Sequence, residues 1–291
     1  MKHYITLWIA LLILPILMLR TANADSALEE VRAKGVLTVC MDVRNLPYSN
    51  ADPELPGLYV EIAHLLAEEL GVKLDLHWLN TLRDSLLADM IRGHCDCVIG
   101  VPIEERAMSE AIQLGKNVDF SNPIFGTGYI LVKQKSNPAS PKTLEDIKLE
   151  TIGTEAGSIA SDVLRQMGYN RRVYRSQIAV LDALKKGQIA YGYVWSNIGW
   201  LIEKGSRIQQ PEQTDTAYPE LEIVKEYIPE ARLRWNIAIA FSKETPTQKT
   251  RELQNVVNTI IEQKWSEEEL KELCEKYYLP YFAPFQEDEE K

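Results

Sequence analysis

The chain contains 291 residues and carries a formal net charge of −10 at pH 7, from 42 acidic and 32 basic side chains. This length suits two lobes of ordinary domain size, each with its own hydrophobic core. The acidic balance and the lack of a basic stripe argue against a nucleic-acid partner, because phosphate binding needs clustered lysine and arginine.

The first 24 residues have the pattern of a secretory signal peptide. A short basic start precedes an apolar run over 5–19, and Ala-Asn-Ala at 22–24 fits the small-residue cleavage rule. An uncleaved membrane anchor is the alternative, since the run is near the lower length limit for a span. We expect cleavage before Asp25 and export of a soluble protein to the periplasm.

The first part of the exported chain predicts a β-α-β-α-β unit. β-Branched and alternating runs indicate strands, whereas apolar residues at helical spacing that stop at a glycine indicate helices. In chain order these are a strand over 35–42, a helix over 58–71, a strand over 72–79, a helix over 82–93 and a strand over 95–102. This alternation implies parallel strands in a doubly wound sheet.

A second β-α-β-α-β unit follows an extended segment over 117–134. Its elements are a strand and turn over 149–158, a helix over 159–168, a strand over 171–176, a helix over 178–187 and a strand over 188–195. A strand over 232–243 then returns to the first unit, and two helices over 247–265 and 266–280 close the chain.

The chain therefore crosses twice between two α/β lobes, near residues 130 and 233. We predict that 25–130 and 233–291 form the first lobe and that 131–232 form the second. The fold class is α/β, with two lobes, two hinge crossings and a cleft that faces the carboxyl ends of the strands.

Four cysteines are candidates for disulfides in an exported protein: Cys40, Cys95, Cys97 and Cys274. The Cys-x-Cys spacing at 95–97 is too tight for a common zinc site or redox pair. If 95–100 is a strand, Cys95 and Cys97 point to the same face, and either one is able to meet Cys40.

The remaining chemistry-bearing residues indicate no enzyme. His64, His77 and His94 are scattered along the chain and suggest no shared metal. The sequence contains no nucleophile elbow, phosphate-binding loop or zinc motif. We therefore predict no metal site, no cofactor and no catalytic activity.

Several blocks resemble those of exported two-lobe solute receptors of the amino-acid-binding class, the family 3 solute-binding proteins. They include GVLTVCMDVRNLPYS, GLYVEIAHLLAEELGVKLDLHWL, IRGHCDCVIGVPIEER, VDFSNPIFGTGYILV and AVLDALKKGQIAYGYVWS, in the same order as in the family. The resemblance covers nearly all of the exported chain. It implies the type 2 periplasmic-binding-protein fold, with a ligand held in the cleft.

The resemblance also implies a set of cleft-lining residues: Asp42, Asn45, Tyr48, Val101, Arg106, Gly157, Ser158 and Trp195. Arg106 corresponds best to the arginine that clamps a ligand carboxylate, and the turn at Gly157–Ser158 offers backbone N–H groups to an anion. The acid that such receptors place after the last strand of the second lobe is absent, because Trp195 stands there.

These residues also have structural interpretations. Arg106 is equally a surface ion-pair partner of Glu104 or Glu105, and a stretch of extra residues follows it. Asp42 and Asn45 are residue types that cap loops. Tyr48 and Trp195 are interpreted either as cleft-lining or as core aromatics.

CMDVRNLPYSN, CDCVIGVP and YGYVWSNIGWLI resemble a narrower branch, the periplasmic J-type proteins of methanol oxidation. This resemblance implies a Cys40–Cys95 bridge, although the strand register makes a Cys40–Cys97 contact more obvious. It also implies an accessory role, with a periplasmic quinoprotein dehydrogenase or its cytochrome as partner.

The alternative function is that of an ABC-transporter receptor for an amino acid or other small carboxylate. Cleft closure over the ligand would then be the signal to the permease. Trp195 discriminates between the two hypotheses, because an apolar, filled cleft would favour the dehydrogenase accessory.

Overall fold

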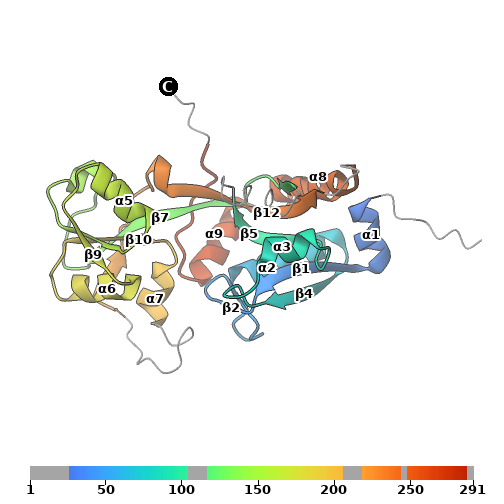
Figure 1. The fold of residues 1–291 in the computed structure, drawn as a ribbon, viewed down its shortest axis with the longest axis horizontal. Helices are drawn as coiled ribbons and strands as arrows, with labels where there is room; N and C mark the ends of the chain where they lie inside the picture. Colours follow the sequence, from blue (N-terminus) through green and yellow to red (C-terminus); the bar gives the residue numbers. More distant parts are fainter. Residues whose placement is uncertain (1–25, 104–116, 206–217, 244–247, 287–291) are drawn as a thin grey trace, which may run out of the picture.

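The structure is a computed structural model that describes residues 26–103, 117–205, 218–243 and 248–286. Figure 1 shows two groups of strands and helices that lie end to end, joined by long strands near the middle of the molecule. Among the described residues, every helix is too short or too polar to cross a lipid bilayer.

The sheet of the first lobe is built around strand β1 (Val36–Asp42), which pairs in parallel with β4 (Lys73–Leu79) and β5 (Cys97–Pro102). Strand β12 (Arg234–Lys243) runs antiparallel to β5, and β6 (Asn117–Phe120) runs antiparallel to β12. Parallel strands of this kind are covered on both faces, which explains the nearly continuous burial of β1.

The helices of the first lobe cover the two faces of this sheet unequally. On one face, a large core includes residues of α1 (Ala27–Lys34), α2 (Leu58–Leu70), α8 (Gln248–Gln263) and α9 (Glu267–Lys276). On the other face, the short helix α3 (Leu86–Ile91) packs over β1 and β5. The loop after β1 contains a two-stranded ribbon, formed by Arg44–Asn45 (β2) and Ser49–Asn50 (β3).

The second lobe has its own sheet, in the order β7 (Phe125–Gln134), β10 (Tyr191–Trp195), β8 (Ile152–Glu155) and β9 (Arg171–Tyr174). β8 is parallel to both of its neighbours, whereas β10 is antiparallel to β7. A further strand, β11 (Leu221–Ile223), pairs with β7.

Three helices cover the sheet of the second lobe. Residues of α6 (Gln177–Lys185) and α7 (Ile198–Lys204) form the core on one face, and residues of α5 (Ile159–Gln166) form the core on the other. Two 3₁₀ helices, Glu145–Ile147 and Ala231–Leu233, lie in the connections. Each lobe therefore buries apolar residues on both faces of its own sheet.

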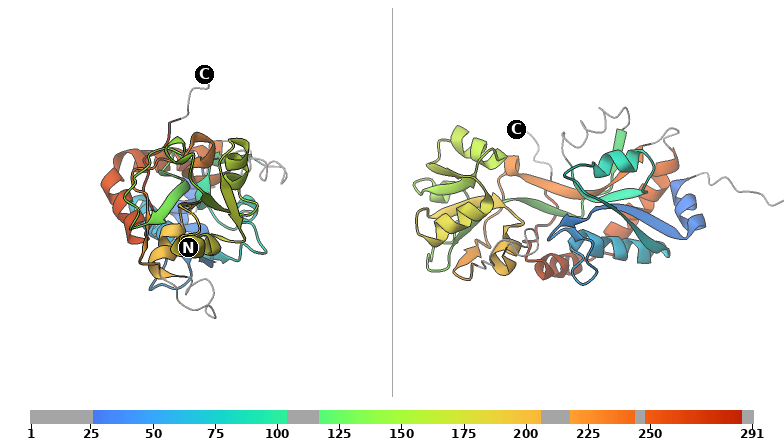
Figure 2. Two further views of the ribbon diagram at one scale, coloured as in Figure 1. Left: turned by 90° about the vertical axis from the view of Figure 1, so that its left-hand side faces the viewer. Right: turned by 60° about the horizontal axis from the view of Figure 1, so that its bottom comes forward.

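Strands β7 and β12 connect the lobes. Residues 125–128 of β7 pair with residues 234–237 of β12 in the first sheet, and residues 129–134 pair with strands of the second sheet. Figures 1 and 2 show these two strands side by side between the lobes. The predicted two-lobe α/β fold with two crossings is confirmed. We retain 25–130 with 233–291, and 131–232, as the proposed bounds of the lobes.

The C-terminal segment passes back over the connecting strands. Gly126 forms an isolated bridge with Phe282, and the Asn236 side chain exchanges two 2.8 Å hydrogen bonds with the backbone of Phe285. The Arg234 guanidinium lies 4.7 Å from the centre of the Phe285 ring. The chain end is thus fastened across both strands of the hinge.

Several elements differ from the predictions. The extended segment over 117–134 is two strands, β6 and β7, separated at 121–124 around Pro123, because proline cannot donate a ladder hydrogen bond. The helix predicted over 82–93 is only α3, which begins after the capping residue Ser85. Helices α1 and α7 were not predicted.

Candidate functional site

The disulfide joins Cys40 to Cys95, with Cα atoms 5.6 Å apart, whereas Cys97 and Cys274 are free and buried. The contact that the strand register favoured, Cys40 with Cys97, is wrong. Strand β5 begins only at Cys97, which pairs with Val39 and therefore points to the face opposite Cys40. Cys95 lies in the preceding loop, where strand alternation does not apply.

A pocket of about 390 Å³ with both apolar and polar lining residues lies at the carboxyl ends of β1 and β5 in the first lobe. Its lining includes Asp42, Asn45, Ser49, Thr81, Asp84 and Val101. The structure therefore brings together three of the predicted residues, Asp42, Asn45 and Val101. The edge formed by the carboxyl ends of parallel strands is where α/β sheets bind ligands.

Asp42 organises the floor of this pocket. Its Oδ1 accepts the Arg44 backbone N–H at 2.8 Å, and its Oδ2 accepts the hydroxyl of Thr81. The Ser49 hydroxyl donates to the Asp42 carbonyl at 2.9 Å. Asp42 thus caps the loop after β1 and lines the pocket as well, which combines both sequence-based interpretations.

A glycine admits an aromatic ring to the wall of the pocket. Gly100 has φ +90°, and a Cβ atom there would lie 2.0 Å from a ring carbon of Tyr59. Any other residue would place its Cβ atom in the space that the Tyr59 ring occupies, so Gly100 allows Tyr59 to pack against β5. The Tyr48 ring stacks on Tyr59 with 4.9 Å between centroids.

Tyr48 also reaches the second lobe. The Trp195 indole N–H donates to the Tyr48 hydroxyl at 3.2 Å, and the hydroxyls of Thr127 and Ser196 lie beside it. Burial raises the pKa of Tyr48, although these hydrogen bonds oppose the shift. The two predicted aromatics therefore meet across the cleft and link the lobes.

Trp195 belongs to an aromatic cluster on the hinge strands. Its ring lies edge-on to the ring of Tyr129 of β7, with 5.3 Å between the ring centroids. The centroid of the Trp235 ring, on β12, is 5.4 Å away. All three side chains are half-buried. Trp195 is therefore neither a fully buried core residue nor a free surface side chain, and it packs beside the two strands that connect the lobes.

Glu155 lies at the same sheet edge as Trp195, and sequence reasoning did not single it out. It ends β8, whose residues pair in parallel with those of β10, so Glu155 and Trp195 lie at the same edge of the sheet. Burial raises the pKa of the Glu155 carboxyl, and its charge contributes to the raised pKa of Tyr129. The sequence did contain a signal for Glu155, because an acidic residue stands between a predicted strand and the Ala-Gly-Ser turn.

Gly157 and Ser158 form the turn from β8 to α5. Gly157 has φ +74°, and Ser158 caps α5 by accepting the Ser161 backbone N–H at 3.1 Å. The Ser158 hydroxyl also donates to the Glu155 carbonyl at 2.8 Å and lies beside the Tyr129 hydroxyl. Predicted Arg106 lies outside the described residues.

Two histidines meet an aspartate on the first lobe, a proximity that the sequence did not reveal. His77, Asp89 and His94 place their ligand atoms within 4.8 Å of one another. Only His64 stays separate among these three histidines, exposed on α2. The sequence concealed this cluster because its members lie on a strand, a helix and a loop.

Residues 37–280 match the family described as bacterial extracellular solute-binding proteins, family 3. This match spans most of the chain and agrees with the two-lobe fold and the pocket at the strand ends. The protein therefore belongs to family 3 of the bacterial extracellular solute-binding proteins.

Among curated proteins, the chain is similar to the L-cystine-binding protein TcyJ of two strains of Escherichia coli. Identity is 30% over 170 residues, which cover 57% of this chain and 60% of the relative. The alignment thus spans less than two thirds of the length of these relatives.

Solved structures show the same fold at low identity. The L-cystine solute receptor of Neisseria gonorrhoeae, in its unliganded open conformation, has a TM-score of 0.68 at 18% identity and covers 90% of this chain and 100% of its own. An ancestral cationic amino acid solute-binding protein has a TM-score of 0.61 at 21% identity, covering 87% and 100%. An ancestral cyclohexadienyl dehydratase has a TM-score of 0.62 at 20% identity, covering 88% and 97%.

Proposed function

We propose that this protein is the extracellular substrate-binding component of an ABC transporter for an amino acid. The carrying observation is the pocket at the carboxyl ends of β1 and β5, where Asp42 and Asp84 stand among apolar side chains and which adjoins the Tyr48–Trp195 contact with the second lobe. Its volume of about 390 Å³ suits a small solute. Family membership and the similarity to L-cystine-binding proteins support the same function.

The charges around the cleft favour a ligand that carries an ammonium group. Asp42 and Asp84 line the first-lobe pocket, and Glu155 lies at the edge of the second lobe. Hydrogen bonds between an ammonium and a carboxylate are charge-assisted and about twice as strong as neutral ones. Glu155 therefore takes the role of the acid that was expected at the position of Trp195.

A ligand carboxylate would bind to positively polarised or positively charged groups of the protein. The first turn of α5, which follows Gly157 and Ser158, presents backbone N–H groups to an anion. Arg106 remains the proposed clamp for the same group. The half-buried faces of Tyr129 and Trp195 add a surface for cation–π contact with the ammonium.

Ligand binding between the lobes would favour their closed arrangement. The chain crosses between the lobes on the paired strands β7 and β12. The C-terminal segment is hydrogen-bonded to β12 at the same place, so the hinge consists of these two short crossings. A solute that contacts both lobes shifts the equilibrium between the open and closed arrangements towards the closed one. A permease is able to recognise the closed arrangement. Cleavage of the predicted signal peptide over 1–24 and export to the periplasm fit this function.

Thermal unfolding in the presence of single solutes tests the proposal. We expect L-cystine or L-arginine to raise the melting temperature at concentrations above Kd, and succinate, which lacks an ammonium group, to leave it unchanged. Isothermal titration calorimetry then gives the stoichiometry, expected to be one. If no amino acid stabilises the protein but a dicarboxylate does, the proposed ammonium recognition is wrong.

A second function has one observation in its favour. Trp195 and Tyr48 join the lobes with the protein's own side chains, a feature expected of a protein that docks to a periplasmic quinoprotein dehydrogenase or its cytochrome. The acids that line the pocket and the amino-acid-binding relatives favour the solute receptor. Affinity capture from periplasmic extract separates the two, because recovery of a dehydrogenase without any amino-acid response would support docking.

A further inference from the structure

Two imidazoles converge on one carboxylate oxygen on the first lobe, outside the proposed cleft. His77 Nε2 lies 2.8 Å from Asp89 Oδ2, and His94 Nδ1 lies 3.1 Å from the same oxygen. The two imidazole ring centres are 5.9 Å apart and tilted by 56°. The three ligand atoms all lie within 4.8 Å of one another.

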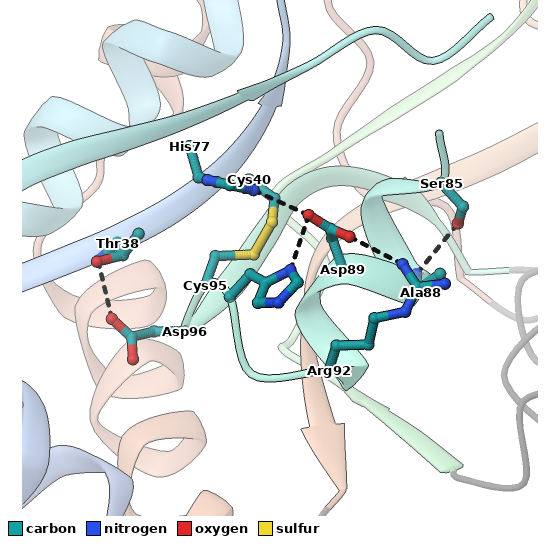
Figure 3. The surroundings of a disulfide bond; sticks show 10 residues. Thr38, Cys40, His77, Ser85, Ala88, Asp89, Arg92, Cys95 and Asp96 are labelled. Atoms are coloured by element: carbon teal, nitrogen blue, oxygen red, sulfur yellow. Dashed lines mark hydrogen bonds and ion pairs between the residues drawn. A yellow bond between two sulfur atoms is a disulfide. The ribbon is translucent and has the colours of Figure 1, made fainter. Parts of the chain in front are cut away.

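The fold holds these residues from three directions, and the disulfide lies among them. His77 is the register partner of Cys40 in the parallel β1–β4 pair, and His94 directly precedes Cys95. The His94 backbone N–H donates to the Asp89 carbonyl at 3.1 Å. Figure 3 shows His77 and Asp89 next to the Cys40–Cys95 bond. The covalent bond thus fixes the spacing of the cluster.

The carboxylate is oriented by its other oxygen. Arg92 donates to Asp89 Oδ1 at 2.9 Å, so Oδ2 is directed towards the histidines, as Figure 3 shows for His77. The Asp89 side chain is 11% exposed, whereas those of His77 and His94 are 38% and 53% exposed. Partners that fix a ligating carboxylate in this way raise metal affinity, and the exposed imidazoles give an ion access.

We propose that His77 Nε2, Asp89 Oδ2 and His94 Nδ1 bind a divalent transition-metal ion such as Zn²⁺. Zinc bonds of about 2.0–2.1 Å in tetrahedral geometry place neighbouring ligand atoms about 3.3 Å apart. The two distances to Asp89 Oδ2, 2.8 and 3.1 Å, are a few tenths of an ångström shorter, and the two imidazole nitrogens lie within 4.8 Å of each other, so small side-chain movements admit the ion.

The ion replaces the protons that otherwise lie between the imidazoles and the carboxylate. Imidazole and carboxylate ligands suit zinc and its neighbours rather than calcium or magnesium, which prefer oxygen ligands alone. A water molecule completes the coordination on the exposed side. The site is distinct from the solute pocket, although Ser85 and Leu86 at the start of α3 line that pocket.

Isothermal titration calorimetry with Zn²⁺ on residues 25–291 in the disulfide-bonded form tests the proposal. We expect one ion per chain, with at least about tenfold weaker binding in His77→Gln and in His94→Gln. His64→Gln is the matched control, since His64 is exposed on α2, and it should bind as the wild type does. No binding by the wild type, or equal binding by the cluster variants, overturns the site.

Nuclear magnetic resonance of the wild type gives a second readout that needs no folded variant. One equivalent of Zn²⁺ should shift the imidazole ring signals of His77 and His94 and leave those of His64 in place. A shift of the His64 signals alone, or of none, shows that the cluster is a metal-free hydrogen-bonded contact between β4 and α3 and contradicts the proposal.

Discussion

Single carboxylates carry much of the proposed chemistry, and each is positioned by its neighbours rather than by its own sequence context. Asp42 is held by the Arg44 backbone and the Thr81 hydroxyl, so its position depends on two loops that follow different strands. Glu155 depends on the strand pairing that places β8 beside β10. The residue scale is therefore where the solute proposal is most directly tested.

Glu155→Gln should weaken amino-acid binding by about tenfold or more. The amide keeps the size of the side chain but loses the charge that pairs with an ammonium, and a hydrogen bond to a charged group contributes about 1.5–3 kcal/mol. Calorimetric titration with the best amino-acid ligand measures the change in Kd. Glu150→Gln, an exposed change in the same lobe, is the control and should bind normally. Equal affinity in both variants would remove Glu155 from the site.

Elements of the first lobe are joined by two kinds of cross-link, one covalent and one ionic. The disulfide ties β1 to the loop between α3 and β5, and Glu61 ties α2 to the end of α9. Both links connect segments that are distant in sequence, but only the disulfide also constrains the unfolded chain. The Glu61 contact acts in the folded state alone.

Removing the disulfide should destabilise the first lobe. The bond joins residues 55 positions apart, for which the chain-entropy model gives about 4 kcal/mol. Urea unfolding of the double variant Cys40→Ala/Cys95→Ala measures the loss, and zinc affinity should fall in the same variant. Cys97→Ala, which removes one buried free sulfur, is the comparison and should cost less. A smaller loss in the double variant than in Cys97→Ala would contradict this role.

The Glu61 contact should make stability depend on acid pH. Burial opposes ionisation of Glu61, but hydrogen bonds from Lys276 at 2.6 Å and Tyr277 at 2.8 Å outweigh it and hold the pKa of the carboxyl below its usual value. When the pKa of a carboxyl is lower in the folded protein than in the unfolded chain, its ionised form stabilises the fold. This stability is fully present at pH values above the unfolded-chain pKa, and it is lost as the pH falls through the folded-state pKa.

Glu61→Gln should therefore lose about 1 kcal/mol of unfolding free energy near neutral pH, and the difference from wild type should shrink below about pH 4.5. Denaturant unfolding at a series of pH values measures this. Glu68→Gln, exposed on the same helix, should differ little from wild type at any pH. A Glu61→Gln difference that grows on acidification would reverse the assigned sign.

At the scale of the whole molecule, the cleft and the hinge determine what the protein is able to signal. The Tyr48–Trp195 hydrogen bond joins the lobes beside strands β7 and β12, and the C-terminal segment crosses those same strands. A ligand that contacts both lobes adds to this connection, so closure is the expected response to binding.

Small-angle X-ray scattering should show a smaller radius of gyration when the amino-acid ligand is bound. The physical reason is that rotation of the lobes about a two-strand hinge brings their outer ends closer together. Succinate serves as the solute control and should leave the radius unchanged. An unchanged radius with a saturating amino acid would mean that binding does not close the lobes.

The sequence by itself determined the local elements and the class of fold. Periodicity reports which face of each strand or helix is buried, so the β-α-β-α-β order of both lobes and a return strand, expected over 232–243 and found over 234–243, were predictable. The crossings near 130 and 233 followed from where that alternation breaks. The family resemblance, and the Cys40–Cys95 bridge that it implied, were carried by contiguous blocks.

Only the tertiary structure decided which distant side chains meet. Because β5 starts at Cys97, Cys95 lies in the preceding loop outside the strand alternation, and the two cysteines are buried in different cores. His77, Asp89 and His94 come from a strand, a helix and a loop, and Glu155 comes from the neighbour of the expected strand. Such contacts depend on sheet order and element boundaries, which local periodicity does not encode, because it reports burial and not the identity of the partner.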